Sequence, residues 1–341
     1  SGSPYICCMI FPQLIIFQER RTAQRGLIIF SDRSYTNKEE KMLKHIVVAM
    51  LLSCLSLLPA FGDPIIDNDG KVVRPTRPFQ RIISLYAAHT RNLIDMGAGT
   101  QIVAVGRSDK QMPDLPALSF RNDPERLLAL KPDLVLIRPM LSRAYPQMVK
   151  RLEENRVTVV SLQPTSVDEM FRYWENLGVL SGHRDEAAQM IARFGAGLAE
   201  IKEQVEGIPE EKRKTVYFES IHKRMKTFAP ESMAMFVLES AGGINAAADA
   251  VQVRKSNIAE YGKERILVQA EKIDVFLAQE GRMNKVSKEM IIHEPGFQVI
   301  KAVRQDQVFL VDEKLVSRPT MGLLQGIRTV FNILYPAADA S

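Results

Sequence analysis

The sequence has few of the residue types on which covalent and metal chemistry usually depend. Its 341 residues include three cysteines, five histidines and one tryptophan. The cysteines are Cys7, Cys8 and Cys54, so all of them precede residue 63. The rest of the chain therefore has no thiol for catalysis, for a disulfide bond or for a cysteine-ligated metal cluster.

Common catalytic and nucleotide-binding motifs are also missing. None of the patterns G-x-G-x-x-G, G-x-x-x-x-G-K-[ST], G-x-S-x-G and H-E-x-x-H stands at a strand–turn–helix position. The charge is nearly balanced, with 45 Lys and Arg against 40 Asp and Glu and a formal net charge of +5. So small an excess does not predict binding to nucleic acid or to a membrane surface.

Residues 42–62 have the pattern of a secretory signal peptide. A short basic start at Met42 is followed by the apolar run Ile46–Pro59, and Ala60 and Gly62 supply small residues for cleavage before Asp63. The run is too short for a permanent membrane-spanning helix. We expect the chain to be exported and to work in the periplasm or another extracytoplasmic compartment.

Two alternatives exist for this N-terminal region. Leu51-Leu52-Ser53-Cys54 is similar to a lipobox and would attach a lipid at Cys54, although the apolar run continues past it. In the second alternative, the apolar run Ile46–Pro59 forms a buried helix of the folded protein. Residues 1–41 carry no sorting pattern, and we expect them to be a non-native or untranslated extension before a true start at Met42.

Beyond an N-terminal extension over residues 63–79, short apolar runs alternate with helical periodicity. The predicted strands are Ile82–Leu85, Ile102–Val105, Leu134–Ile137, Val157–Leu162, Thr215–Phe218, Val275–Ala278 and Gln307–Val311. The predicted helices are Thr90–Met96, Pro124–Leu130, Pro146–Glu154, Val167–Leu177, Ser232–Ala241, Lys263–Ala270, Ser287–Ile292 and Met321–Leu334. Continuous apolar strands separated by helices are typical of parallel sheets covered on both faces.

The segment 183–207 interrupts this alternation. It has no proline, and its apolar residues recur at spacings of three and four, which predicts one helix of about six turns. We therefore expect an α/β fold in which two Rossmann-like lobes, at residues 80–182 and 208–341, are joined by one long rigid helix. A ligand cleft is expected where the strand ends of the two lobes converge.

Three segments of the chain together resemble one family. RIISLYAAHTRNLIDMGAGTQIVAVGRSD, NDPERLLALKPDLVLIRP and VFLVDEKLVSRPTMGLLQGI, in this order around the long helix, are similar to class III periplasmic substrate-binding proteins. The resemblance covers about residues 80–335. It implies a protein without intrinsic cofactor or enzymatic activity that captures a ferric siderophore, haem or cobalamin and delivers it to an ABC permease dimer with its ATPase.

The resemblance also implies a docking surface. Family members carry one glutamate before the ALKPDLV element and another at the first helix of the C-terminal lobe, where they dock onto arginines of the permease; Glu125 and Glu231 occupy these positions. Alternatively, each carboxylate only stabilises the N-terminus of its own helix through the helix dipole. The loop Tyr86–Arg91 departs from the family pattern, and the single Trp174 is placed on a helix of the N-terminal lobe, so the ligand is not identified.

Polar residues follow the predicted strands at the ends where ligands bind in open α/β sheets. They are Tyr86, His89, Arg107, Asp109, Arg138, Arg143, His222, Lys223, Arg224, Gln279, Glu280, Arg282, Ser317 and Arg318, and the apolar Met140 lies among them. Arginine suits bidentate contact with carboxylates and phosphates, so this set predicts an anionic ligand. Alternatively, the arginines are solvated or paired locally with Asp109, Asp123 and Glu280.

Two histidines and one tyrosine are candidate ligands of a metal carried by the bound compound. Tyr86 and His89 follow the first strand, and His222 from the other lobe would face them across the cleft. Alternatively, His89 caps its helix and Tyr86 packs on the loop. His183 and His293 are expected to be structural.

Two further functions remain open on the same fold. A receptor for molybdate or tungstate would need several direct arginine contacts. An enzyme acting on a chelate would use Asp109, Glu280 and His222 as an acid–base set. We expect a monomer that binds a small anionic molecule and no nucleic acid.

Overall fold

The computed structural model describes residues 64–121, 124–253 and 256–336. The predicted signal peptide, the extension 1–41, the lipobox cysteine Cys54 and Asp123 lie outside these residues. Among the described residues, no helix is long and apolar enough to cross a membrane.

The N-terminal lobe is built on a five-stranded sheet with the order β5-β4-β3-β6-β7, and all its pairings are parallel. Its strands are β3 (Ile82–Ser84), β4 (Ile102–Gly106), β5 (Ala117–Leu118), β6 (Leu134–Ile137) and β7 (Thr158–Ser161). Its helices are α2 (Ala87–Asp95), α3 (Pro124–Leu128), α4 (Pro139–Ala144), α5 (Pro146–Glu154) and α6 (Val167–Ser181). A short antiparallel hairpin of β1 (Ile65–Ile66) and β2 (Val72–Val73) precedes them.

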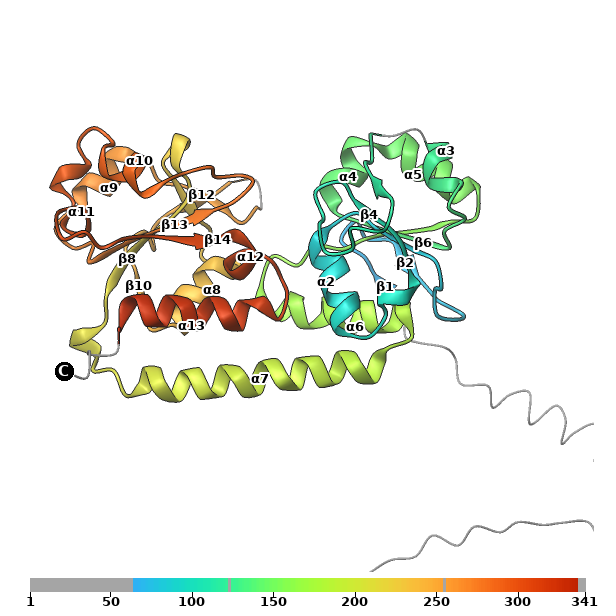
Figure 1. The fold of residues 1–341 in the computed structure, drawn as a ribbon, viewed down its shortest axis with the longest axis horizontal. Helices are drawn as coiled ribbons and strands as arrows, with labels where there is room; N and C mark the ends of the chain where they lie inside the picture. The colour runs from blue at the N-terminus through green and yellow to red at the C-terminus, as the bar shows by residue number, and fades with distance from the viewer. Residues whose placement is uncertain (1–63, 122–123, 254–255, 337–341) are drawn as a thin grey trace, which may run out of the picture. The chain divides into compact units, whose positions relative to one another are not determined.

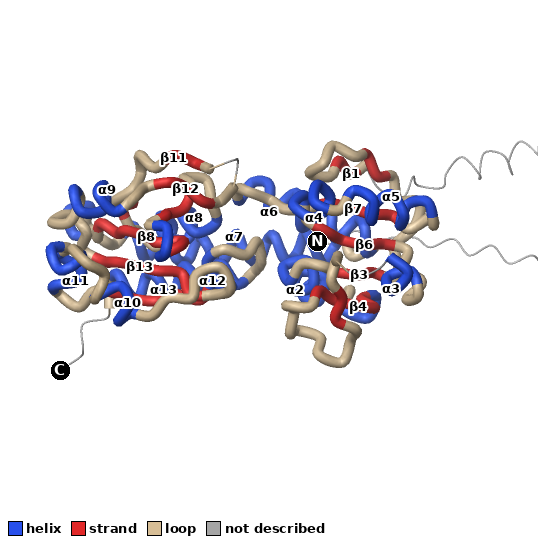
Figure 2. Tube along the Cα trace, turned by 90° about the horizontal axis from the view of Figure 1, so that it is seen from above, coloured by secondary structure: helices blue, strands red, loops and turns tan. Residues whose placement is uncertain are grey.

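The C-terminal lobe has a seven-stranded mixed sheet with the order β11-β12-β9-β8-β13-β14, and β10 also pairs with β8. Its strands are β8 (Thr215–Ile221), β9 (Lys226–Phe228), β10 (Ile244–Asn245), β11 (Val251–Gln252), β12 (Ile258–Glu260), β13 (Val275–Glu280) and β14 (Val308–Asp312). Its helices are α8 (Met233–Ser240), α9 (Lys263–Val268), α10 (Lys288–Ile292), α11 (Lys301–Arg304), α12 (Glu313–Val316) and α13 (Gly322–Leu334). Figure 2 shows the strands of each sheet lying side by side.

Successive residues of the central strands are buried on opposite faces of the sheets. On β6, Leu134 and Leu136 belong to one apolar cluster, whereas Val135 and Ile137 belong to another that includes α3 and α5 residues. Helices cover both faces of the N-terminal sheet, with α2 and α6 on one side and α3, α4 and α5 on the other (Figure 1). Burial on both faces explains why such strands read as unbroken apolar runs.

The helix α7 (Arg184–Glu206) joins the two lobes. His183 precedes it and Gly207 ends it, and its 23 residues give a length of about 34 Å. It lies beside α6 of the N-terminal lobe and α8 and α13 of the C-terminal lobe (Figure 1). One apolar cluster contains residues of all these helices and of both sheets, so the lobes share a continuous core.

Aromatic side chains form the centre of this shared core. Phe194 of α7 packs edge-on against Phe171 and Trp174 of α6 and stacks on Phe236 of α8. The centroids of the Phe194 and Trp174 rings are 5.5 Å apart, a separation at which such pairs add to the gain from burial. The fully buried Trp174 therefore lies against the helix that joins the two lobes.

Two buried hydrogen bonds tie the N-terminal lobe to the loop between α12 and α13. The carbonyl oxygen of Pro319 accepts from Asn92 Nδ2 at 2.9 Å and from Trp174 Nε1 at 3.1 Å. Both donors are fully buried. Since breaking a buried hydrogen bond leaves its partner without water to replace it, these contacts hold the loop in place.

A buried histidine anchors the first turn of α2 to the sheet. His89 Nε2 lies 3.1 Å from the carbonyl oxygen of Ile137, and Nδ1 lies 2.7 Å from the Tyr173 hydroxyl. A carbonyl can only accept, so Nε2 carries the proton and Nδ1 accepts from the tyrosine. Burial lowers the pKa of His89 from 6.5 to about 3, because the charged ring would lose its hydration.

The predicted fold class is confirmed, and the differences have local causes. The prediction missed seven strands, because each has only two or three residues and so cannot show alternation: β1, β2, β5, β9, β10, β11 and β12. The helix α2 begins at Ala87, three residues before the predicted start at Thr90. His89 consequently lies inside the helix, on its buried side.

The close contact between α12 and α13 gives a test of the packing. A Cβ atom on Gly326 would lie 2.0 Å from the carbonyl oxygen of Leu315, whereas one on Gly195 of α7 would meet nothing within 4 Å. We expect Gly326→Ala to lower the free energy of unfolding by about 2 kcal/mol or more. Gly195→Ala, the matched control, should raise it by roughly 0.5–1 kcal/mol. Urea unfolding measures both, and a Gly326→Ala protein as stable as the original would contradict the packing.

The neutral His89 predicts a pH dependence of stability. Below pH 6.5 the unfolded chain binds a proton at this ring, while the folded chain does so only near pH 3. The free energy of unfolding should therefore fall by up to about 1.4 kcal/mol per pH unit as the pH drops through this window. His89→Gln should remove this slope, whatever its effect at pH 7. Parallel stability curves for the two proteins between pH 4 and 7 would refute the assignment.

Candidate ligand-binding site

The carboxyl ends of β3 and β6 bring Tyr86 and Arg138 together. Tyr86 follows β3 and precedes α2, and Arg138 follows β6 and precedes α4 in an extended conformation. The two strands are paired neighbours in the centre of the sheet. The guanidinium carbon of Arg138 lies 4.4 Å from the centroid of the Tyr86 ring, a cation–π contact.

Arg138 has hydrogen-bonding capacity left over. Its Nε atom is buried and has no hydrogen-bond partner in the described part of the chain. A buried N–H without a partner is unfavourable by about 1–3 kcal/mol. The aromatic contact holds the guanidinium in place but does not satisfy the Nε donor.

The C-terminal lobe contributes an ion pair to the same place. Arg318 Nη2 donates to Glu313 Oε1 at 2.9 Å, and the backbone N–H of Arg282 donates to Glu313 Oε2 at 2.9 Å. The side chains of Arg318 and Glu313 keep 25% and 16% of their surface exposed, so a small molecule can reach them.

Tyr86 responds to charges from both lobes. Burial raises the pKa of its phenol above the ordinary value, the charges of Arg138 and Arg318 oppose this shift, and the charge of Glu313 adds to it. Charges act over several ångströms, and the bond from Asn92 of α2 to the carbonyl of Pro319 holds the Arg318 loop beside the helix that Tyr86 precedes. We call Tyr86, Arg138, Glu313 and Arg318 the Tyr86 cluster.

His89 does not meet the prediction that it contacts a ligand or its metal. It is fully buried, and both ring nitrogens are already engaged, by Tyr173 and by the carbonyl of Ile137. Its ring packs edge-on against Tyr86, with 5.1 Å between the centroids. His89 therefore packs against the Tyr86 ring and has no nitrogen left to ligate a metal.

His222 is likewise enclosed, which corrects its predicted place opposite His89. Only 6% of its side chain is exposed; Nδ1 lies 3.0 Å from both carboxylate oxygens of Glu219, and Nε2 lies 3.8 Å from Glu294. The hydrogen bond that Nδ1 donates to the Glu219 carboxylate raises the pKa of His222 despite burial. Lys263 completes the network through Glu294 at 2.6 Å. This is an internal ion network of the C-terminal lobe.

The remaining predicted basic residues are exposed, and among the described residues none of their side chains makes a hydrogen bond or ion pair with the Tyr86 cluster. Arg107, Lys223, Arg224 and Arg282 have exposed side chains. Asp109 is buried and accepts from the amide of Gln111, not from an arginine. Met140 and Glu280 are exposed on the surface. Ser317 donates a hydrogen bond to the side-chain oxygen of Gln279.

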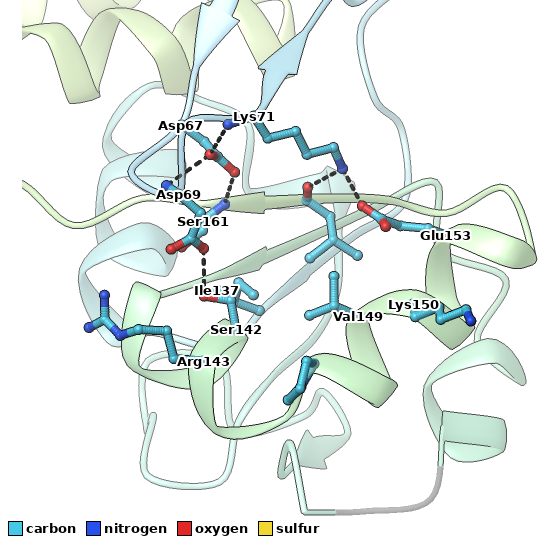
Figure 3. A pocket seen from close by; sticks show the side chains of 12 residues that line it. Asp67, Asp69, Lys71, Ile137, Ser142, Arg143, Val149, Lys150, Glu153 and Ser161 are labelled. Atoms are coloured by element: carbon cyan, nitrogen blue, oxygen red, sulfur yellow. Dashed lines mark hydrogen bonds and ion pairs between the residues drawn. The ribbon is translucent and has the colours of Figure 1, made fainter.

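Arg143 lies at a different cavity, which the sequence did not predict. This cavity has a volume of about 380 Å³ and lies between the turn of the β1–β2 hairpin and the helices α4 and α5 (Figure 3). Asp67 closes one side by accepting from the backbone N–H groups of Asp69, Lys71 and Ser161. Ser142 links the two walls by donating to Asp69 at 2.5 Å.

Metal binding by the chain alone has no support among the described residues, where no group of three or more His, Cys, Asp and Glu could hold a metal ion. Sequence reasoning also missed Glu313. It lies two residues beyond Val311, where the predicted strand ends. The rule that found Arg318 would have found it.

The two predicted docking glutamates are both on the surface. Glu125, in the first turn of α3, keeps 61% of its side chain exposed and contacts Arg151 Nη2 of α5 at 3.1 Å. Glu231 is exposed and immediately precedes Ser232, which caps α8 by accepting from Met235 N.

Comparisons with known proteins identify relatives along most of the chain. An uncharacterized ABC transporter substrate-binding lipoprotein of Bacillus subtilis is 24% identical over 315 residues, which cover 84% of this chain and 96% of that protein. A Staphylococcus epidermidis structure, described as a possible iron-binding (periplasmic solute-binding) protein, matches with a TM-score of 0.66 and 24% identity over 76% of this chain and 100% of its own.

Further solved structures share the fold but differ in what they are named for. A protein of an Fe³⁺-hydroxamate transport system from Saccharomonospora viridis matches with a TM-score of 0.62 and 23% identity over 81% of this chain and 100% of its own. Other structures of the same fold are named for haem, vitamin B12 and molybdate. The fold therefore does not select the ligand.

The family itself is established by a match that spans more than half of the chain. The model of the family described as "Periplasmic binding protein" matches residues 82–315, which include both sheets and α7. The chain belongs to this periplasmic binding protein family, whose members bind substrates for transport and are not enzymes.

Proposed function

We propose that this substrate-binding protein captures a metal chelate, either a ferric siderophore, haem or a corrinoid, and delivers it to the permease of an ABC importer. The observation that carries the proposal is the Tyr86 cluster, in which groups that follow strands of both sheets act on one phenol. Ligands of open α/β sheets bind beyond the carboxyl ends of the strands.

The chemistry of the cluster supports a ligand with an anionic edge and a metal centre. The unpartnered donor of Arg138 suits a carboxylate, propionate, hydroxamate or phosphate oxygen. Tyr86 offers an aromatic face and a phenol oxygen. Since both histidines are enclosed by protein partners, Tyr86 is the one predicted metal-ligating residue that we retain for contact with the metal of the chelate.

A molybdate or tungstate receptor is the second candidate, and the cluster supports it less well. Such an oxyanion would need several arginines with free donors around one small volume. In the cluster only Arg138 has an unpartnered buried donor among the described atoms, while Arg318 is paired with Glu313. Two charges on a small anion would remain partly uncompensated there.

We also propose that Glu125 and Glu231 dock onto basic residues of the permease. Both carboxylates are exposed, and each lies at the start of a helix in a different lobe. Exposed charges of this kind steer association and contribute to orientation more than to raw affinity. With one docking glutamate in each lobe, the permease would contact both lobes of the binding protein.

Loss of Arg138 should weaken ligand binding. We expect the full chain to bind a ferric trihydroxamate, haemin or cyanocobalamin with micromolar or better affinity, about −8 kcal/mol. Arg138→Ala should cost about 1–3 kcal/mol, the range for a hydrogen bond to a charged group. Arg193→Ala, which removes an exposed arginine of α7, is the matched control and should bind normally.

Absorption titrations with the three chelates, and calorimetry with molybdate, measure these affinities. If no chelate binds while molybdate does, the protein is an oxyanion receptor. Equal chelate affinity in Arg138→Ala and the control would remove Arg138 from the site.

Docking can be separated from capture by a double substitution. Glu125→Ala with Glu231→Ala should abolish uptake into cells while leaving the affinity for the chelate unchanged, because neither side chain belongs to the Tyr86 cluster. Glu203→Ala, an exposed glutamate of α7, controls for loss of surface charge. Uptake at the normal rate in the double variant, or a weakened chelate affinity, would refute the docking role.

A further inference from the structure

Glu313 is the carboxylate of the Tyr86 cluster, and its two oxygens are separately held. Oε1 accepts from the guanidinium of Arg318 and Oε2 accepts from the backbone N–H of Arg282, each at 2.9 Å. The side chain is 16% exposed, less than the 25% of Arg318. The carboxylate therefore fills the place where an anionic group of a ligand would meet Arg318.

The surrounding backbone is shaped to receive this side chain. A Cβ atom on Gly281 would lie 2.3 Å from Glu313 Oε2, so only glycine leaves room for the carboxylate. Asp312 caps the turn by accepting from the backbone N–H of Lys314 at 2.8 Å, which fixes the residue before Glu313. The position is thus constrained from both sides.

The backbone around Arg318 is held in place, and its guanidinium is paired with Glu313. The next residue, Pro319, is held through its carbonyl by Asn92 and Trp174, both fully buried. The backbone N–H of Thr320 also donates to the carbonyl of Arg318 at 2.8 Å. A ligand must therefore bind in the presence of Glu313, because displacing it would leave a half-buried carboxylate without its guanidinium.

The charges around Tyr86 follow from this pairing. Arg138 and Arg318 each carry one positive charge, and Glu313 carries one negative charge, so the cluster has one net positive charge. At partly buried sites, where the effective dielectric constant is well below that of water, one nearby unit charge changes the affinity for a charged ligand group by roughly tenfold or more. A single carboxylate is therefore enough to change which ligand charge the site prefers.

We propose that Glu313 is a specificity-determining residue, an internal counter-ion that limits the site to chelates with little net negative charge near Tyr86 and discriminates against polyanions. The inference deepens the proposed function and rests on it. A neutral or singly negative chelate meets the Arg138 guanidinium with little repulsion, whereas a compact trianion is repelled by Glu313. A dianionic oxyanion is disfavoured for the same reason.

The test compares two ferric chelates of similar size and different charge. A neutral ferric trihydroxamate and a trianionic ferric tricatecholate are titrated against the full chain and against Glu313→Gln, which keeps the shape of the side chain and removes its charge. Because Glu313 lowers the net charge of the cluster from two positive charges to one, the original protein should bind the trianionic chelate less tightly, relative to the neutral one, than Glu313→Gln does. Glu313→Gln should raise the affinity for the tricatecholate relative to the trihydroxamate by at least tenfold, and added salt should reduce this change.

Two further variants make the result decisive. Glu280→Gln, an exposed carboxylate next to Gly281, makes the same change in net charge outside the cluster and should alter the ratio less than threefold. Glu313→Ala repeats the charge change with a smaller side chain, in case the glutamine variant does not fold.

The outcomes distinguish the role of Glu313 from the proposed function. A ratio that stays within twofold in both Glu313 variants, with binding intact, overturns the role of Glu313 and leaves the proposed function standing. An equal shift in Glu280→Gln also overturns it, because the effect would then come from overall charge. Failure of the original protein to bind either chelate, haemin or cyanocobalamin removes the proposed function together with this inference.

Discussion

The carbonyl oxygen of Pro319 is the contact on which the arrangement of the candidate ligand site depends. It lies in the C-terminal lobe, one residue after Arg318, and both of its hydrogen-bond donors belong to the N-terminal lobe. One donor, Asn92, is on α2, the helix that Tyr86 precedes. The two buried bonds therefore fix Arg318 relative to Tyr86, although the two residues are more than 200 positions apart in the sequence.

The shared core makes this local constraint effective over the whole molecule. Trp174, the other donor to Pro319, also packs against Phe194 of α7, which in turn stacks on Phe236 of α8. One apolar cluster thus extends from the N-terminal sheet through α6 and α7 to the C-terminal sheet. Since packed interiors resist small displacements, large opening movements would have to break this cluster. We therefore expect small adjustments on ligand binding, not wide hinge closure.

The parts of the structure that depend on local periodicity could be predicted from the sequence. Strands such as Leu134–Ile137 and the helix α7 have long apolar patterns with clear boundaries. The strands of two or three residues other than β3 and the first turn of α2 could not be predicted, because tertiary pairing determines them. Because α2 begins at Ala87, His89 lies inside the helix and is fully buried, so it is not available as a ligand. His222 was misplaced because its partner Glu219 lies within a strand that looked shorter than it is.

For the candidate site, the strand-end rule found Tyr86, Arg138 and Arg318 but gave too many arginines. Proximity to a strand end does not show which way a long side chain turns, and Arg107, Arg224 and Arg282 are exposed. What distinguishes Arg138 is its contact with the Tyr86 ring, and what distinguishes Arg318 is the held carbonyl beside it. Both features join residues far apart in sequence, so no pattern within the sequence could show them.

The central claim is that a metal chelate binds against Tyr86, and Trp174 provides a direct measurement of it. This single tryptophan donates to the carbonyl next to Arg318, so a coloured ferric chelate in the site should quench its fluorescence. We predict saturable quenching by a ferric trihydroxamate in the original protein and its loss in Tyr86→Ala at the same concentrations. Quenching with unchanged affinity in Tyr86→Ala would contradict the account, because the ligand would then bind elsewhere.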